Sequence, residues 1–254
     1  MKKLQLLVLT LLLAITPTFS HAQTADEIID NYFENTGGKT AWENVSALKY
    51  SGTADAQGME IPWIMYMTKS GKQALTINLQ GQTMTQFAFD GETMWTTNFM
   101  TMSPEKSDAE ASENIKKSSS KSFPSPFLNY KEKGYTVELI GDEVIEGTET
   151  FKIKLVEDPI MVDGVETPSI TFYYFDKENF VPIAIETEVK QGPMAGQTIK
   201  DIMSDYQEVE GLYFPFSMTQ GGQPLSVKSI EINPEIDAAV FEFPTVQDNS
   251  DKKE

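Results

Sequence analysis

The feature that most constrains the fold is a series of twelve strand-like runs separated by glycine-containing turns. Apolar residues in these runs recur at a period of two, and Asp90-Gly91 is the clearest hairpin signal between them. Except at residues 103–134, no helical pattern separates consecutive runs. This pattern predicts one large antiparallel sheet, strongly curved or nearly closed, in a mainly β fold. The runs cover residues 47–56, 59–69, 73–79, 83–89, 93–102, 135–140, 150–156, 170–175, 181–189, 198–209, 212–219 and 225–232.

Two helical patterns precede the first strand. Thr24-Ala25-Asp26-Glu27 has the residue types of a capping box, and Gly37-Gly38 ends the helix that follows. Thr40-Ala41-Trp42-Glu43 repeats the capping pattern and predicts a second, shorter helix or a turn. We expect both elements to close one end of the sheet.

The strand pattern is interrupted by a polar segment, Ser103–Tyr130, that is rich in Ser, Lys and Glu. It predicts two exposed helices, one at 108–117 and one at 126–133. A segment of this length without strands inside a β domain indicates a functional insertion or a linker. We therefore expect one domain over residues 23–247, with a lid or insertion at 103–134. A division into two domains at this segment is the alternative.

The first 22 residues have the parts of a secretory signal peptide. A basic start, Met1-Lys2-Lys3, is followed by an apolar run and by Ser20-His21-Ala22, after which we expect cleavage. Because no cysteine lies near this junction, a lipid anchor is not expected. The signal predicts a soluble, exported protein, in the periplasm or the medium. At the other end, residues 248–254 are predicted to form a disordered polar tail.

Composition narrows the function classes. The formal charge is −18, and it becomes −20 once Lys2 and Lys3 leave with the signal peptide. This charge argues against nucleic acid or an anionic membrane surface as a partner. The sequence has no Cys, and its single His, His21, lies in the signal peptide. The mature chain thus lacks the side chains most used for acid–base chemistry, nucleophile activation and zinc binding, so no catalysis, cofactor or metal is predicted.

Carboxylates are the remaining candidates for chemistry. Glu186 and Glu188 share a strand face, as paired catalytic carboxylates would in a carboxylate-only hydrolase. Nothing in the sequence brings a general acid opposite them, which favours solvated edge charges instead. Acidic pairs such as Asp142-Glu143 lack the ordered ligand spacing of a calcium loop.

Methionine and aromatic residues are concentrated in the first strands, and in the stretch that begins at Met59 they fall on alternate positions, which share one strand face. Methionine is unbranched and adaptable, and surfaces that accept varied apolar ligands use it heavily. One interpretation is therefore a cavity wall that receives acyl chains. The other is an ordinary core in which methionine fills gaps. The candidate cavity residues are Met59, Ile61, Trp63, Met65, Met67, Met84, Phe87, Met94, Trp95, Phe99 and Met100.

Five passages, taken in order, resemble a bacterial family of periplasmic outer-membrane lipoprotein-sorting proteins, which is related to the lipoprotein carrier and receptor of the Lol system. The resemblance spans nearly all of the mature chain and rests on an ordered set of strand and turn motifs. The passages are ADEIIDNYFENTGGKTAWENVSALKYSG, FDGETMW, FYYFDKENFVPIAIETEV, SDYQEVEGLYFPFSMTQ and IEINPEIDAAVFEFP.

The resemblance implies an open, incompletely closed antiparallel β-barrel with a helical lid and a hydrophobic cavity between them. It implies a periplasmic carrier that binds lipid or the acyl chains of a lipoprotein, without catalysis, and that makes transient contact with membrane-bound transport components. In the best-known carrier an arginine inside the cavity helps to hold the lid closed. This sequence has no arginine, so that latch is not carried over.

Composition leaves one alternative function open. A secreted, non-catalytic interaction domain with a filled core and no lipid ligand would act through its acidic surface. Its binding to a basic partner would weaken with salt. The sequence does not specify an oligomeric state.

Overall fold

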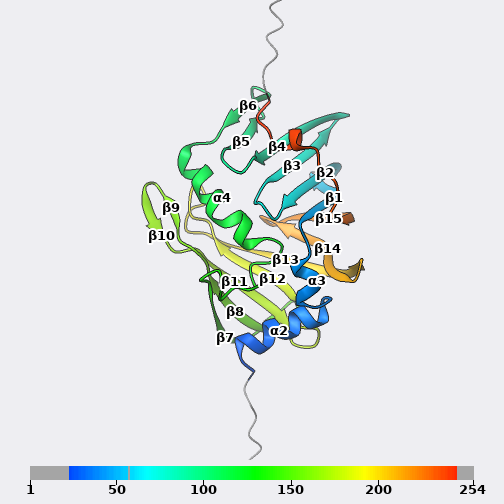
Figure 1. The fold of residues 1–254 in the computed structure, drawn as a ribbon, viewed down its shortest axis with the longest axis vertical. Coiled ribbons are helices and arrows are strands. Elements are labelled where there is room, and N and C mark those ends of the chain that lie inside the picture. The colour runs from blue at the N-terminus through cyan, green and yellow to red at the C-terminus, as the bar shows by residue number, and fades with distance from the viewer. Residues whose placement is uncertain (1–22, 57, 245–254) are drawn as a thin grey trace, which may run out of the picture.

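The computed structural model describes residues 23–56 and 58–244, which form a mainly β protein with three α-helices (Figure 1). The predicted signal peptide, 1–22, and the predicted tail, 248–254, lie outside the described residues. The helices are α2 (Ala25–Asn35), α3 (Lys39–Glu43) and α4 (Ala109–Ser122), and a short 3-10 helix covers Ala238–Val240. The strands are β1 (Ala47–Ala56), β2 (Met59–Thr68), β3 (Gln73–Leu79), β4 (Gln82–Phe89), β5 (Met94–Asn98), β6 (Ser103–Lys106), β7 (Thr136–Ile145), β8 (Thr148–Val156), β9 (Ile160–Val162), β10 (Val165–Thr167), β11 (Ile170–Asp176), β12 (Pro182–Glu188), β13 (Thr198–Val209), β14 (Leu212–Gln220) and β15 (Gln223–Ile232).

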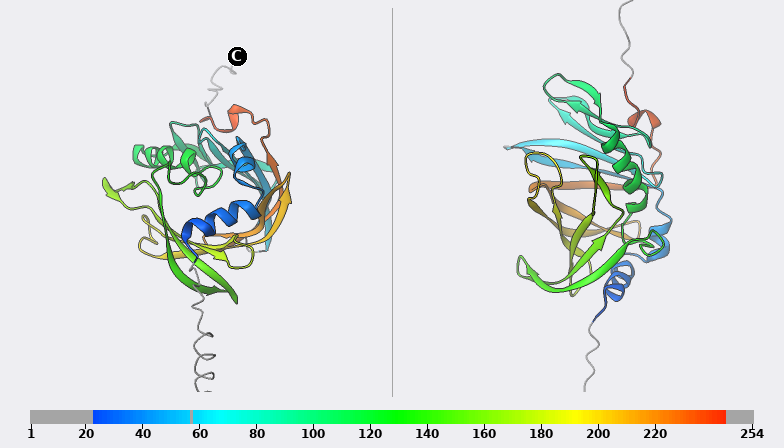
Figure 2. Two further views of the ribbon diagram at one scale, coloured as in Figure 1. Left: turned by 60° about the horizontal axis from the view of Figure 1, so that its bottom comes forward. Right: turned by 90° about the vertical axis from the view of Figure 1, so that its left-hand side faces the viewer.

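Thirteen of the described strands form a single antiparallel sheet. Their order is β6-β5-β4-β3-β2-β1-β15-β14-β13-β12-β11-β8-β7, while β9 and β10 form a separate hairpin. The edge strands β6 and β7 do not pair with each other, so the sheet is not closed into a barrel. Figure 2 shows the sheet curling round, with α2 inside the curve. The predicted open, incompletely closed barrel is confirmed.

All twelve predicted runs are strands, although several boundaries differ. The run predicted at 93–102 ends at Asn98, because the chain turns there and Met102 has a left-handed φ of 57°. Strands β6, β9 and β10 were not predicted. Each has only three or four residues, too few to display an alternating pattern.

Helix α2 begins with the predicted capping box. The Thr24 hydroxyl accepts the Glu27 N–H at 3.2 Å, and the Glu27 carboxylate accepts the Thr24 N–H at 2.8 Å. Helix α3 forms where the second helix is predicted, but its N-cap is Gly38 without a side-chain cap. The predicted cap at Thr40 is therefore wrong, and Thr40 lies inside the helix.

The polar segment at 103–134 contains β6, α4 and a run of turns. Helix α4 extends beyond the predicted 108–117 and is capped by Asp108, whose carboxylate accepts an N–H of the first turn at 2.7 Å. The helix predicted at 126–133 does not form, because the chain makes successive turns there and Asn129 has a left-handed φ of 51°. In Figures 1 and 2, α4 crosses the open side of the curved sheet.

The main core fills part of the concave side of the sheet, and we call it the inner core. Its rings meet edge to face, as in Tyr32 and Phe175, whose centroids are 5.8 Å apart. It combines the buried sides of α2 and α3 with inward residues from both halves of the sheet, so the helices close one end of the fold as predicted. Its members are Ile28, Ile29, Tyr32, Phe33, Trp42, Val45, Leu48, Trp63, Phe123, Phe127, Leu128, Tyr130, Tyr135, Ile153, Leu155, Phe175, Leu212, Phe214, Val227 and Ile230.

The C-terminal segment after β15 packs on the convex side of the first strands. Phe241 is buried there with Trp95, and Phe243 meets the Trp95 ring edge to face at 5.8 Å. The Trp95 indole N–H donates to the Phe241 carbonyl at 3.1 Å. This segment therefore covers an apolar patch that would otherwise face solvent.

Replacing Phe241 with Ala should destabilise the protein by about 3–5 kcal/mol, because it empties a buried aromatic site. The matched control is Phe99→Ala, at a position 47% exposed, for which we expect a change within about 0.5 kcal/mol. Chemical denaturation of both variants measures the difference. Equal stabilities would show that the C-terminal segment does not anchor the convex face.

Candidate functional site

The strand register places most of the predicted cavity residues on one face of the sheet. Across β1 and β2, Tyr50 lies opposite Met65 and Gly52 lies opposite Trp63. Opposite residues in an antiparallel pair point to the same side. On β3, Leu75 continues this face opposite Met65.

The same face extends through β4 and β5. Phe87 lies opposite Leu75 on β3, and Met94 lies opposite Phe89 on β4. A register shift after Leu75 keeps Met84 on this side, where it pairs with Ile77. The predicted residues that share this face are Met59, Ile61, Trp63, Met65, Met67, Met84, Phe87 and Met94.

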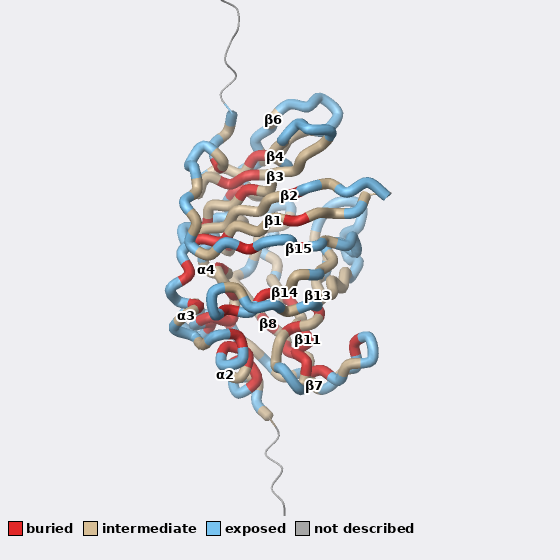
Figure 3. Tube along the Cα trace, turned by 90° about the vertical axis from the view of Figure 1, so that its right-hand side faces the viewer, coloured by how far each residue is buried: buried red, intermediate tan, exposed pale blue. Residues whose placement is uncertain are grey.

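This face is the concave side of the sheet, because Trp63 belongs to the inner core and Met65 and Met67 pack against that core. Only Trp63 is fully buried; the two methionines and Leu75 stay half-buried, and Figure 3 shows this intermediate burial along β2 and β3. Across the curve, Met218 on β14 is half-buried in the same way. These apolar side chains on the concave side are therefore only partly covered by the described residues.

Three predicted residues do not join this face. Trp95 points to the convex side, where the C-terminal segment covers it, because alternate residues of β5 face opposite ways. Phe99 and Met100 lie after the end of β5 and are 47% and 95% exposed. Met59, at the start of β2, shares the concave register but is 61% exposed.

The concave side also holds tyrosines that the sequence analysis did not select. Burial raises the pKa of Tyr32 to about 12, a rise that a contact with Ser125 partly offsets. Burial likewise raises the pKa of Tyr50 and of Tyr173, although both side chains keep some accessible surface. The alternation of Tyr50 with Leu48 on β1 is the signal that could have identified it.

A pocket of about 700 Å³ opens at the end of the fold that α2 occupies. Its lining is mixed, with apolar groups such as Val181 and Met203 beside Asn35 and Asp176. The Tyr206 hydroxyl, also at this pocket, donates to the Pro182 carbonyl at 2.6 Å. The volume lies in the range of small-molecule sites.

Helix α4 is fastened to the β9–β10 hairpin by polar contacts. The Asn114 amide donates to the Met161 carbonyl at 2.7 Å and accepts the Met161 N–H at 2.8 Å. The Glu110 carboxylate accepts the N–H groups of Asp163 and Gly164, at 2.9 and 2.7 Å. Near the end of the helix, Lys121 pairs with Asp158, and the Ser122 hydroxyl donates to Glu157 at 2.7 Å.

The other side of α4 meets β5 and the turns that precede β3 and β5. Lys116 pairs with Glu92 at 2.5 Å, and the Ser112 hydroxyl accepts the Met94 N–H at 3.1 Å. Ser119 sits directly over Gly71, where a Cβ would come within 2.6 Å of the hydroxyl oxygen. The helix thus bridges the β9–β10 hairpin and the β3–β5 part of the sheet with polar and small side chains, without an arginine.

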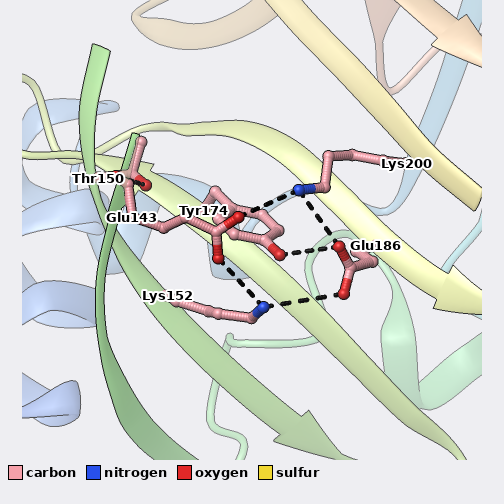
Figure 4. Close-up of polar contacts among 6 residues, drawn as sticks. All are labelled: Glu143, Thr150, Lys152, Tyr174, Glu186 and Lys200. Atoms are coloured by element: carbon pink, nitrogen blue, oxygen red, sulfur yellow. Dashed lines mark hydrogen bonds and ion pairs between the residues drawn. The ribbon is translucent and has the colours of Figure 1, made fainter. Parts of the chain in front are cut away.

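A second polar cluster lies on the convex side of β7, β8 and β11–β13 (Figure 4). The Glu186 carboxylate accepts the Tyr174 hydroxyl at 2.9 Å and pairs with Lys200 at 3.2 Å and Lys152 at 3.8 Å. Both lysines also pair with Glu143, at 3.2 and 3.4 Å. The two positive and two negative charges compensate each other.

This cluster revises the expectation for the paired glutamates. Burial alone would raise the pKa of Glu186, but hydrogen bonds from Tyr174 and Lys200 and the lysine charges hold it below its ordinary value. Glu188 pairs separately with Lys190 at 2.9 Å. Glu186 is therefore an ionised structural group, neither a general acid nor a solvated edge charge.

Two further properties concern only residues 23–56 and 58–244. No group of three or more His, Asp or Glu side chains there is arranged to hold a metal ion. No helix in this part of the chain has the length and apolar character needed to cross a membrane.

No protein-family model matches this sequence, and no curated protein is significantly similar to it. Solved structures, however, share its fold. A LolA superfamily protein from Nitrosomonas europaea matches with a TM-score of 0.50 and 13% identity, over 87% of this chain and 98% of that chain. This likeness confirms, at the level of the fold, the resemblance to lipoprotein-sorting proteins.

Two other solved structures are similar. A DUF1329 family protein from Desulfovibrio piger matches with a TM-score of 0.49 and 12% identity, over 87% of this chain and 98% of that one. A Vibrio parahaemolyticus domain named for outer membrane lipoprotein sorting matches with a TM-score of 0.46 and 13% identity, over 85% and 94%.

Replacing Asn114 with Ala removes both hydrogen bonds between α4 and Met161, so we expect local detachment of α4 without global unfolding. Amide exchange in α4 and in β9–β10 should accelerate roughly thirtyfold, the effect of two net hydrogen bonds of about 1 kcal/mol each. Lys117→Ala, at an exposed position of the same helix, is the control. If amide exchange in the β9–β10 hairpin did not change, the Asn114–Met161 hydrogen bonds would not be what holds α4 to the hairpin.

Replacing Glu186 with Gln should lower thermal stability at pH 7 and have little effect in strong acid. The folded-state pKa of Glu186 lies below its unfolded value of 4.5, so its stabilisation is present above that value and is lost as pH falls through the folded-state pKa. Thermal melts from pH 2 to pH 8 measure this. Glu166→Gln, exposed on β10, is the control, and a difference that does not change with pH would refute the ion-pair assignment.

Proposed function

We propose that this protein is a periplasmic carrier or binding protein for lipid or for the acyl chains of a lipoprotein, which it holds on the concave side of the sheet beneath α4, without catalysis. The observation that carries the proposal is the half-buried apolar wall that includes Met65, Met67, Leu75 and Met218. A soluble domain seldom leaves such a concave apolar surface partly uncovered unless it receives an apolar partner.

The chemistry of this wall suits an acyl chain. On β1, β2, β14 and β15, none of the inward positions that surround Tyr50 and Met65 carries a charged residue. Methionine side chains adapt to chains of different shape. Each buried methylene contributes about 0.8 kcal/mol before the costs of association, so a long chain offers ample gross binding energy.

The fold supports the same class of function. The LolA superfamily protein shares the open barrel, and the sequence itself resembles lipoprotein-sorting proteins in the order of its motifs. The missing arginine latch does not prevent closure here, because Glu110 and Asn114 fasten α4 to the β9–β10 hairpin. A lipid or an acylated lipoprotein is the proposed ligand, and membrane-bound transport components are the proposed transient partners.

The test compares two Met→Asp variants for binding of a neutral hydrophobic dye, N-phenyl-1-naphthylamine, and its displacement by lipid. Met65→Asp places a charge on the concave wall and should weaken dye binding more than tenfold, because an unpaired charge in an apolar site is costly. Met100→Asp makes the same chemical change at an exposed position and should bind the dye as the wild type does. Circular dichroism checks the fold of each variant.

If Met65→Asp does not fold, Met65→Trp provides a second variant, because it narrows the space without adding charge and should reduce affinity for the longest chains first. Native mass spectrometry of the purified full chain should also detect bound lipid. If the wild type binds neither dye nor lipid, the carrier function is excluded. The acidic interaction domain with a filled core is then the function to pursue.

A further inference from the structure

The three tryptophans of the chain differ in how their indole N–H groups are satisfied. The Trp42 N–H donates to the Thr36 carbonyl at 3.1 Å, and the Trp95 N–H donates to the Phe241 carbonyl at 3.1 Å. The Trp63 N–H is buried but finds no acceptor among the described residues. Trp63 is only 7% exposed.

The position of Trp63 is fixed by its neighbour on β1. A Cβ at Gly52 would come within 2.7 and 2.9 Å of two carbons of the Trp63 ring, Cζ2 and Cε2. The absence of a side chain at Gly52 therefore allows the indole to lie across β1. Cε2 is bonded to the indole nitrogen, so the edge of the ring that carries the N–H is the edge that lies over Gly52.

The Ser226 carbonyl oxygen lies on the same side of Gly52, 2.0 Å from where a Cβ would stand, but it does not accept the indole N–H, which has no partner among the described residues. Met65 follows Trp63 on the inward face of β2, and Tyr50 lies diagonally across from it on β1. An indole N–H is a donor only, and leaving it buried and unpaired costs about 1–3 kcal/mol. Such groups are uncommon in native proteins, and each calls for a partner from a ligand or a water.

We propose that the Trp63 N–H donates a hydrogen bond to the carbonyl oxygen of an acyl ester or amide, so that the protein recognises acyl chains in preference to alkyl chains without a carbonyl. This inference rests on the proposed function, because it requires a lipid on the concave side. A hydrocarbon chain alone fills the apolar wall but leaves the N–H unpaired. A neutral carbonyl supplies the acceptor without bringing a charge to a wall that has no cation to pair with it.

The test uses two neutral probes with chains of equal length: 1-palmitoylglycerol, which has an ester carbonyl, and 1-O-hexadecylglycerol, an ether without one. The wild type should bind the ester roughly fivefold to tenfold more tightly, the effect of one net hydrogen bond. Trp63→Phe keeps an aromatic ring but has no donor, so it should bind both probes alike. Trp95→Phe, on the convex side, should keep the preference.

A second measurement uses NMR of the wild-type protein, to which either probe is added. In the ¹⁵N-labelled wild type, each tryptophan gives one indole N–H resonance. The ester should move the Trp63 resonance downfield, as a newly formed hydrogen bond does, while the ether should not. The Trp42 and Trp95 resonances, whose donors are already paired, serve as internal controls.

The outcomes separate this inference from the function on which it rests. If both probes bind equally and the Trp63 resonance responds alike to each, carbonyl recognition is overturned while the carrier function stands. If neither probe binds and no lipid displaces the dye, the proposed function fails and the inference fails with it. If Trp63→Phe does not fold, the titration of the wild type decides the question.

Discussion

The fold depends on the pairing of β1 with β15, which joins the first and last strands of the sheet at its middle. Leu48 lies opposite Ile232 and Tyr50 opposite Ile230, so inward residues from the two ends of the chain become neighbours. Asn233, at a left-handed φ of 54°, fastens the end of this ladder, and its side chain accepts the Ser46 N–H at 2.6 Å. Without this ladder the strands on either side would form two separate sheets, and the concave wall would not exist.

Packing differs between the two ends of the concave side. At the α2 end, Ile28, Ile29 and Phe33 are fully buried and the rings interlock, so that end is a conventional core. Beneath α4 the wall residues are half-buried, and the helix above them contacts the rest of the protein mainly through Asn114, Glu110 and small serines. A helix held by polar contacts gains little from apolar burial, so its release would not break the core. The proposed carrier function needs such a division between a firm core and a helix that can move.

The candidate site was predictable from the sequence to the extent that strand alternation sets it. Trp63, Met65 and Met67 alternate on β2, and the structure places all three on the concave side, as their spacing requires. Trp95 is also a tryptophan in a strand, but its position in the alternation of β5 places it on the convex side. The run predicted to end at Met102 instead turns after Asn98, which leaves Met100 exposed. Composition cannot distinguish these cases, because burial depends on which strand lies opposite.

The sequence by itself determined the twelve long strands, the capping box at Thr24 and the methionine-rich character of β2–β5, because strand alternation, helix capping and side-chain chemistry are local properties. Only the tertiary structure decided that β1 pairs with β15, that Asn114 holds α4 to Met161 and that no described residue accepts the Trp63 N–H. The first two features join residues that are far apart in the chain, and the third depends on the absence of an acceptor among the described residues. Contacts of that kind arise when the sheet curls on itself, and no local pattern encodes them.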